Sequence, residues 1–360
     1  MALVLLSASA SALVFAQEPQ TVEGESFVPI TPIERMNPSY PTRSLQHGNE
    51  GWVMLSFVVS ETGEVEEPMI EDSSGVEAFE GAALEAISKW RYTPATVNGK
   101  PVAQSMVKSR ILFALEGPAK GVTREFQSSY RKIRDLLDAG DYTAAKPLLD
   151  EIETEGRHNL YEDALFWALK YGYLEGVQSG DDAEKLRALE LALGHQDDSL
   201  LPADTFIAAA QRLYVLQVRA VDFSAARATF ERLRDSAYAK RSSQHARAVA
   251  ELTPAYEQIE RVIAGPAPLR VKGEIGDHAY WVHDLMRRSF SMADVNGHVE
   301  ALDVRCERGT RRYDTYPTDD AWVVPESWGK CGLYIAGERG TTFTLVEHPA
   351  GTAATPLARE

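Results

Sequence analysis

The residues best suited to chemistry are the chain's only two cysteines, Cys306 and Cys331. Redox-active cysteines often form a Cys-x-x-Cys motif, and these two stand about 25 positions apart, so their spacing favours a structural disulfide over redox chemistry. On the chain-entropy model, a bridge closing such a loop stabilises the fold by about 3 kcal/mol. A disulfide is typical of an exported protein. We expect Trp328, three residues before Cys331, to pack on the bridge.

The eight histidines are scattered along the sequence. His278 and His283 are five positions apart, which on a strand would place them on opposite faces. His195 stands near Asp197-Asp198, a group that either touches a metal or forms a solvated turn after a helix. We favour the turn, and we interpret the acidic pair Asp319-Asp320 as loop surface.

Recognisable catalytic motifs are absent from the sequence: it has no nucleophile elbow, Walker loop or dinucleotide fingerprint. Acid–base sites can be assembled from distant residues, so this observation does not by itself exclude an enzyme. We nevertheless predict a protein that works by binding, without catalytic residues, metal or cofactor.

The net charge of −16 limits the classes of partner that the protein can bind. The sequence has no cluster of basic residues that would form a positive patch. Nucleic-acid binding needs a positive footprint, and so does adsorption to anionic lipid. We therefore exclude both. At 360 residues the chain has room for two or three domains.

Alternating hydrophobicity marks the first ordered region. Every second residue of Val53–Val59 is apolar, which predicts a strand with one buried face. A turn at Glu61–Glu64 leads to a second strand at about Val65–Ser73. Ser74 and Glu77 have the spacing of a capping box, so a helix should begin close after Ser74. The helix face expected to cover the sheet contains Phe79, Ala83, Ile87 and Trp90.

The region ends in another strand. Pro94 should stop the helix, and Asn98-Gly99 should form a turn before a strand at about Gln104–Leu115. Its apolar face contains Val107, Ile111, Phe113 and Leu115, and its polar, wet face contains Gln104, Met106, Lys108 and Arg110. We expect this last strand at an edge of the sheet. Lys108 and Arg110 then either protect the edge or flank a docking edge for an extended peptide.

A set of motifs runs through this region in a fixed order: Tyr40-Pro41, Glu50-Gly51-Trp52-Val53, Gly63-Glu64-Val65, Trp90-Arg91-Tyr92-Thr93-Pro94-Ala95, Asn98-Gly99-Lys100-Pro101 and Ile111-Leu112-Phe113. Together they resemble the C-terminal domain of the TonB energy-transducer family. The resemblance covers about a fifth of the chain.

This resemblance implies binding of a short extended segment, the TonB box, of outer-membrane receptors by strand addition. The implied edge consists of Gln104, Ser105, Met106, Val107, Lys108, Ser109, Arg110, Ile111 and Leu112. The implied helix near the bound segment contributes Tyr40, Pro41, Arg43 and Leu45, the last in place of a common glutamine. The alternative interpretation of Tyr40 and Trp90 is that both are core aromatics.

The N-terminus has the pattern of a signal peptide. Residues 2–15 are apolar or small and uncharged, and Val14-Phe15-Ala16 before Gln17 resembles a cleavage site. A spanning helix needs about 20 apolar residues, so we expect a signal peptide in preference to an anchor, and no span in the mature chain. No Lys or Arg precedes the run. A start upstream of Met1 would leave inner-membrane anchoring open. The short linker that follows reaches only about 55 Å when extended.

The middle of the chain, Val122 to Ala264, is rich in Ala, Leu, Glu and Arg and is predicted to be helical. Asp141, Asp181 and Asp222 recur in short turns at a period of about 40 residues. We interpret this pattern as tetratricopeptide-like repeats. The array offers either a concave protein-binding surface or a bundle that spaces the two end domains.

The remainder changes to β patterns after Pro266-Ala267-Pro268. Phe290–Val295 and Val299–Arg305 flank Asn296-Gly297, which predicts a hairpin. Further strands are expected at residues 269–275, 333–336 and 342–347, in a small β-sandwich.

The whole sequence thus predicts a multidomain α+β protein. Its expected parts are a signal peptide (1–16), a linker (17–32), a TonB C-terminal-like α/β module (33–118), a helical tetratricopeptide-like domain (119–265), a β-rich, sandwich-like domain with a disulfide (266–350) and a flexible tail (351–360).

We expect a periplasmic protein of a Gram-negative bacterium that docks TonB-box segments in TonB-dependent transport. The alternative is a helical-repeat adaptor or scaffold of the cell envelope without a role in energy transduction. Partners are expected among outer-membrane TonB-dependent receptors or other envelope proteins, and the sequence predicts no oligomeric state.

Overall fold

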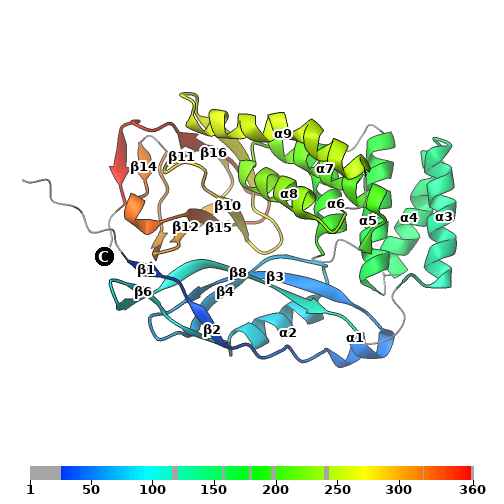
Figure 1. Ribbon diagram of the computed structural model, residues 1–360, viewed down its shortest axis with the longest axis horizontal. Helices are drawn as coiled ribbons and strands as arrows, with labels where there is room; N and C mark the ends of the chain where they lie inside the picture. Colours follow the sequence, from blue (N-terminus) through cyan, green and yellow to red (C-terminus); the bar gives the residue numbers. More distant parts are fainter. Residues whose placement is uncertain are drawn as a thin grey trace, which may run out of the picture.

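The structure is a computed structural model that describes residues 26–115, 121–155, 159–177, 181–195, 200–238, 243–318 and 320–357. An α/β module, a row of helices and a β-rich part follow one another along the chain, which confirms the mixed α+β class. The helices and the β-rich part stand side by side on the same side of the module (Figure 1). The predicted signal peptide and most of the predicted linker lie outside the described residues.

The module is built on one three-stranded antiparallel sheet with strand order β4-β3-β8. Its strands are β3 (Gly51–Val59), β4 (Val65–Ser73) and β8 (Gln104–Phe113). Helix α2 (Glu77–Ile87) covers one face, and α1 (Thr42–His47) follows directly after Tyr40-Pro41. The short strands β1 (Phe27–Val28), β2 (Thr31–Glu34), β5 (Arg91–Thr93), β6 (Ala95–Val97) and β7 (Lys100–Val102) pair as β1-β6-β7 and β2-β5.

Two expectations about α2 are wrong. Its N-cap is Val76, and Ser74 instead exchanges hydrogen bonds with the backbone of Trp52, accepting at 3.1 Å and donating at 3.3 Å. The helix ends at Ile87, before Pro94 can stop it. Trp90 lies past the helix end, where its ring packs edge-on against Phe57 and its Nε1 donates to the carbonyl of Met36.

The expectation of a single buried face on β3 is also wrong. Val53, Leu55, Phe57 and Val59 pack against α2 as predicted. Trp52 lies on the opposite face and is equally buried, because it belongs to the core of the helical part. The sheet is therefore covered on both sides.

The helical part consists of α3 (Arg124–Asp138), α4 (Tyr142–Glu155), α5 (Leu160–Gly176), α6 (Asp182–Leu193), α7 (Ala203–Arg219), α8 (Phe223–Asp235) and α9 (Ser243–Ala264). The recurring aspartates have a common role: Asp141, Asp181 and Asp222 each accept a backbone N–H from the first turn of α4, α6 or α8. These side chains satisfy donors that a helix start leaves open. The tetratricopeptide-like assignment itself stays a prediction.

The β-rich part consists of two sheets, β10-β15-β12-β13 and β17-β14-β11-β16-β9, that share one core. The strands are β9 (Leu269–Glu274), β10 (Tyr280–Asp284), β11 (Ser289–Asn296), β12 (Val299–Cys306), β13 (Gly309–Tyr313), β14 (Ala321–Val323), β15 (Cys331–Gly337), β16 (Thr342–His348) and β17 (Ala354–Pro356). The disulfide Cys306–Cys331 is formed between β12 and β15. Trp328 belongs to the same core cluster as both cysteines.

The predicted hairpin around Asn296-Gly297 is wrong. β11 leads into this turn and β12 leaves it, but the two strands belong to different sheets. The chain therefore crosses from one sheet to the other at Gly297. Almost every residue of β12 is buried, and the strand gains paired neighbours on both sides from β13 and β15. Residues 351–360 were expected as a flexible tail, whereas Ala354–Pro356 pair in parallel with β14.

Candidate docking edge and the pocket beside it

The two outer strands of the module's sheet differ in how open their edges are. β4 contains Pro68, which has no N–H to donate, and Glu67, whose φ is +46°. The pairing of β4 with β3 shifts register twice, and such bulges, charges and prolines are the usual means of blunting an edge. β8 lacks proline and pairs only with β3 in the described part of the chain. Its one register shift and its one positive φ, +58° at Met106, both fall in its first half, so the pairing from Val107 onward is regular. The second half of β8 is therefore the less blunted of the two outer edges.

The face of β8 that was expected to be wet is turned toward the rest of the protein. Ser105 donates a hydrogen bond from its Oγ to the carbonyl of Gly309, 3.2 Å away, and a shorter one to that of Cys306. Met106 lies against Gly332 of β15. These contacts fall in the first half of the strand, beside the turn between β12 and β13.

β4 makes the matching contacts across the same face. The Arg305 guanidinium donates a hydrogen bond to a carboxylate oxygen of Glu67 at 2.9 Å. The Tyr334 hydroxyl donates one to a carboxylate oxygen of Glu71 at 2.7 Å. The Tyr280 hydroxyl bonds the carbonyl of Ile70. Three neighbouring strands of the β-rich part thus rest on β4, so the prediction of a wet second face is wrong.

Around α1, the implied site residues divide into a half-buried and an exposed group. The ring of Tyr40 packs edge-on against Phe79 and Phe113, and its hydroxyl donates to the carbonyl of Asn49. Burial, and then the charge of Glu50, raise the pKa of Tyr40 to about 12. This packing is what the core-aromatic interpretation expects of Tyr40, and Trp90 is 5% exposed. Pro41 provides the N-cap of α1.

The exposed groups are apolar as well as charged. Arg43 and Leu45 project from α1 into solvent, and the side chain of Leu45 is 52% exposed. Leu112, near the end of β8, is 49% exposed. Val107 and Ile111 point into the module's core. The outer end of β8 therefore combines an unpaired edge with an exposed leucine.

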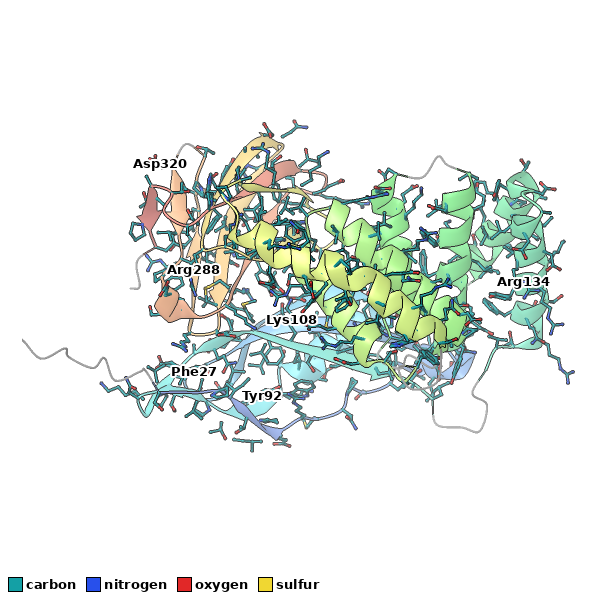
Figure 2. All side chains as sticks on the ribbon, turned by 45° about the horizontal axis from the view of Figure 1, so that its top comes forward. Phe27, Tyr92, Lys108, Arg134, Arg288 and Asp320 are labelled. Carbon is teal, nitrogen blue, oxygen red and sulfur yellow. A yellow bond between two sulfur atoms is a disulfide. The ribbon has the colours of Figure 1, made fainter. Side chains whose placement is uncertain are left out.

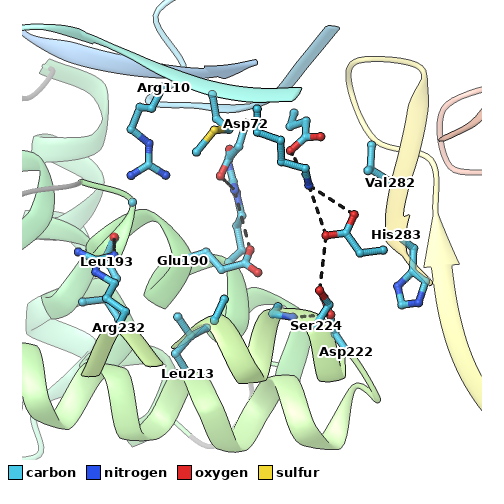
Figure 3. A pocket seen from close by; sticks show the side chains of 18 residues that line it. Asp72, Arg110, Glu190, Leu193, Leu213, Asp222, Ser224, Arg232, Val282 and His283 are labelled. Carbon is cyan, nitrogen blue, oxygen red and sulfur yellow. Dashed lines mark hydrogen bonds and ion pairs between the residues drawn. The ribbon is translucent and has the colours of Figure 1, made fainter. Parts of the chain in front are cut away.

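A pocket of about 460 Å³ lies where all three parts of the protein meet (Figure 3). Its lining comes from β3, β4 and β8 of the module, from α6 to α8, and from β10. The charged lining residues are Glu71, Asp72, Lys108, Arg110, Arg187, Glu190, Asp222, Arg232 and Asp284.

Most charges in this pocket are paired. Arg187 donates to both carboxylate oxygens of Asp72, at 2.9 and 2.7 Å. Lys108 lies 3.2 Å from Glu71 and 3.5 Å from Asp284. Burial alone would lower the pKa of Lys108, but these two carboxylates outweigh burial and raise it.

The histidines that the structure describes do not come together in one site. His195 is 2% exposed, with its Nε2 3.4 Å from Asp163, while Asp197 and Asp198 lie outside the described residues. The expected solvated turn is thus wrong at His195, because that side chain lies against Trp52. His278 is exposed, whereas His283 on β10 is buried with Glu347. Within the described ranges, no three His, Cys, Asp or Glu side chains are placed to hold a metal.

Sequence reasoning did not identify Arg187, Glu190, Arg232 or Asp284 as neighbours of β8. These residues come from α6, α8 and β10, far along the chain. Of the pocket residues from these later parts of the chain, Asp222 had been singled out for its turn and His283 for its spacing from His278. Of the helices in the described part of the chain, none is long and apolar enough to cross a bilayer.

Comparison with known proteins gives matches to the module. Residues 36–115 match the family model of the Gram-negative bacterial TonB protein C-terminal, which confirms the predicted resemblance. A TonB protein of Vibrio cholerae is 36% identical over 83 residues, covering 23% of this chain and 34% of that protein. A tonB2 protein of Pseudomonas aeruginosa is 38% identical over 58 residues, covering 16% and 22%. The chain thus spans about a third or less of these relatives.

Two solved structures are also similar. The TonB C-terminal domain of Pseudomonas aeruginosa has 27% identity and a TM-score of 0.23, covering 25% of this chain and 90% of that one. A tonb2 protein from Vibrio anguillarum has 30% identity and a TM-score of 0.21, covering 31% and 99%.

Proposed function

We propose that this protein docks extended segments of outer-membrane receptors, of the TonB-box type, by adding them as a strand along β8. The observation that carries the proposal is the contrast between the two outer strands, since β4 is blunted and the second half of β8 is regular and unpaired on its outer side among the described residues. The likeness of residues 36–115 to TonB C-terminal domains gives this edge its class of partner. The protein would then act in TonB-dependent transport in the Gram-negative envelope.

The second half of the strand, Ser109–Leu112, is the part of the edge best placed to receive a segment. The first half contacts the β-rich part through Ser105, Met106 and Lys108. Leu112 is exposed beside the open edge and offers apolar contact to alternate side chains of the docked segment.

A backbone-methylation scan of the peptide tests strand addition directly. A TonB-box peptide is titrated into the full chain, and the titration is repeated with single N-methyl groups moved along the peptide. In a strand, alternate N–H groups face the partner, so methylation should abolish binding at every second position and spare the others. Equal tolerance at all positions would exclude pairing along an edge.

Proline variants test the edge from the protein's side. The N–H groups of the neighbouring residues Ser109 and Arg110 point to opposite sides of β8, so proline at one position removes a donor from the open edge and at the other disrupts pairing with β3. The variant that retains the wild-type circular dichroism spectrum should lose peptide binding. Wild-type affinity in that variant contradicts the proposal.

The competing proposal, an envelope adaptor that binds through its helices, requires an accessible face on the helical row. α6 and α8 turn toward the module and line the pocket with Arg187, Glu190, Ala228 and Arg232. Because this face is used within the molecule, we favour docking at β8. A pull-down in which deletion of residues 122–264 abolishes partner recovery, while deletion of the module does not, would favour the adaptor.

A further inference from the structure

Among the residues that the structure describes, Arg110 in the pocket at the three-part junction has no carboxylate in hydrogen-bond or ion-pair contact. Arg110 reaches from β8 into the pocket above Arg232 of α8 (Figure 3). Its guanidinium lies 4.9 Å from the ring of Trp52. Among the described residues it makes no hydrogen bond or ion pair, and its Nε is buried without a partner. A half-buried charge left in this state is costly.

Two features of its surroundings disfavour the charge of Arg110. Burial, and then the charge of Arg232, lower the pKa of Arg110 to about 10, and they outweigh the opposite effect of Asp72. Arg232 is held in place by backbone, donating to the carbonyls of Leu193 and His195. Two guanidinium groups thus converge on one end of the pocket, where an anion would relieve their mutual repulsion.

The remaining carboxylates of the pocket are already engaged. Asp72 is bound by Arg187, Glu71 and Asp284 by Lys108, and Asp222 caps α8. Burial raises the pKa of Glu190 to about 7 despite the nearby Arg187, so this carboxyl is partly neutral near neutral pH. With these acids close by, a singly charged anion fits better than a dianion.

Apolar side chains line the same end of the pocket. Met54, Leu193 and Leu213 are among the lining residues, and Leu193 and Leu213 are each 5% exposed. A volume of about 460 Å³ is within the range of small-molecule sites. The two guanidinium groups favour a ligand with an anionic head group, and these side chains favour a ligand with an apolar body.

We propose that this pocket binds a small monocarboxylate with a short apolar body, its carboxylate between Arg110 and Arg232 and its body against Met54, Leu193 and Leu213. The site is distinct from the open edge of β8, since Arg110 points from the strand's face into the protein.

Isothermal titration of the full chain with hexanoate tests the proposal. We expect saturable binding at a stoichiometry of about one, no binding of hexanol, which lacks the charge, and weaker binding of inorganic phosphate, which has no apolar body and is in part a dianion at neutral pH. Binding of hexanol as strong as that of hexanoate would show an apolar cavity without carboxylate recognition. Binding of phosphate alone would assign the site to another class of anion. Either result, or no heat with hexanoate, overturns the proposal.

Two variants locate the binding. Arg110→Gln should weaken hexanoate binding about tenfold or more, the usual effect of losing a charge-assisted hydrogen bond. Arg91→Gln is the matched control, because Arg91 is an arginine of the same module that lies on the exposed strand β5 near Glu64. It should bind hexanoate as the wild type does. Equal affinity in the Arg110 variant and the wild type contradicts the site.

Discussion

The indole of Trp52 on β3 lies directly against Gly194 at the C-terminal end of α6. A Cβ placed on Gly194 would stand 2.5 Å from Cζ2 of Trp52, too close for any side chain. Gly194 has an ordinary helical φ of −58°, so its small size and not its flexibility is what this contact requires. The helical part packs on the module through this close contact.

Substitution of this glycine should therefore loosen the contact between the two parts. We expect Gly194→Ala to lower the free energy of unfolding by about 1–3 kcal/mol, because the methyl group overpacks a filled core. Gly81→Ala is the control: Gly81 is a helical glycine in α2 with open space around it, and alanine there should add about 1 kcal/mol of stability. Urea unfolding of both variants measures the difference. A stabilising effect at both positions contradicts the contact.

A second prediction concerns the buried carboxylate of Glu347 on β16. Its oxygens bond Nε2 of His283 at 2.9 Å and the backbone N–H of Arg287 at 2.6 Å. The Arg287 guanidinium in turn donates to carbonyls near the end of α9, at Val262, Ile263, Gly265 and Ala267. Removing one member of a buried charged group leaves the others unpaired, so we expect Glu347→Gln to cost about 3–5 kcal/mol in chemical denaturation.

The control for this variant is Glu274→Gln on the exposed side of β9 in the same sheet. An exposed charge contributes little, so its unfolding midpoint should match that of the wild type. If both variants lose the same small amount of unfolding free energy, the buried charged group does not join α9 to the β-rich part.

The disulfide gives a third prediction. Cys306 and Cys331 close a loop with a sequence separation of 25. On the chain-entropy model, the double variant Cys306→Ala, Cys331→Ala should lose about 3 kcal/mol. Urea unfolding with and without dithiothreitol measures this loss: the reductant should lower the wild-type midpoint and leave that of the variant unchanged. An unfolding midpoint of the oxidised wild type equal to that of the variant contradicts the prediction.

The fourth prediction is a dependence on pH that originates at Glu190. Because burial raises the pKa of Glu190 to about 7 in the folded state, the folded protein keeps a proton that the unfolded chain, with a Glu pKa of about 4.3, releases. Stability contributed by this group is present at low pH and lost as the pH rises through about 4 to 7. Glu190→Gln should therefore gain stability relative to the wild type as the pH rises from about 5 to about 8. Urea unfolding at both pH values tests this, and a constant difference contradicts it.

The module was predictable because its patterns are local. Alternating apolar residues indicate strands packed on the nearby helix α2, both in Val53–Val59 and in Gln104–Phe113. The repeated aspartates were recognised as turn residues because helix caps act on backbone groups only three residues away.

The second face of the sheet was not predictable from such patterns. Trp52 is buried by residues more than 100 positions later in the chain, and Lys108 meets Asp284 only in the folded protein. Likewise, Asn296-Gly297 marks a reversal of the chain but carries no information about which sheet the next strand joins. The pocket between the parts depends entirely on such distant contacts.

The two covered faces and the blunted strand β4 also limit the number of partners. In the described part of the chain, the sheet has no free face on which a second copy could stack, and β8 is the edge at which we propose that a segment docks. Binding by strand addition should therefore saturate at one segment per protein molecule. The arrangement favours a discrete one-to-one complex over growth into a polymer of sheets.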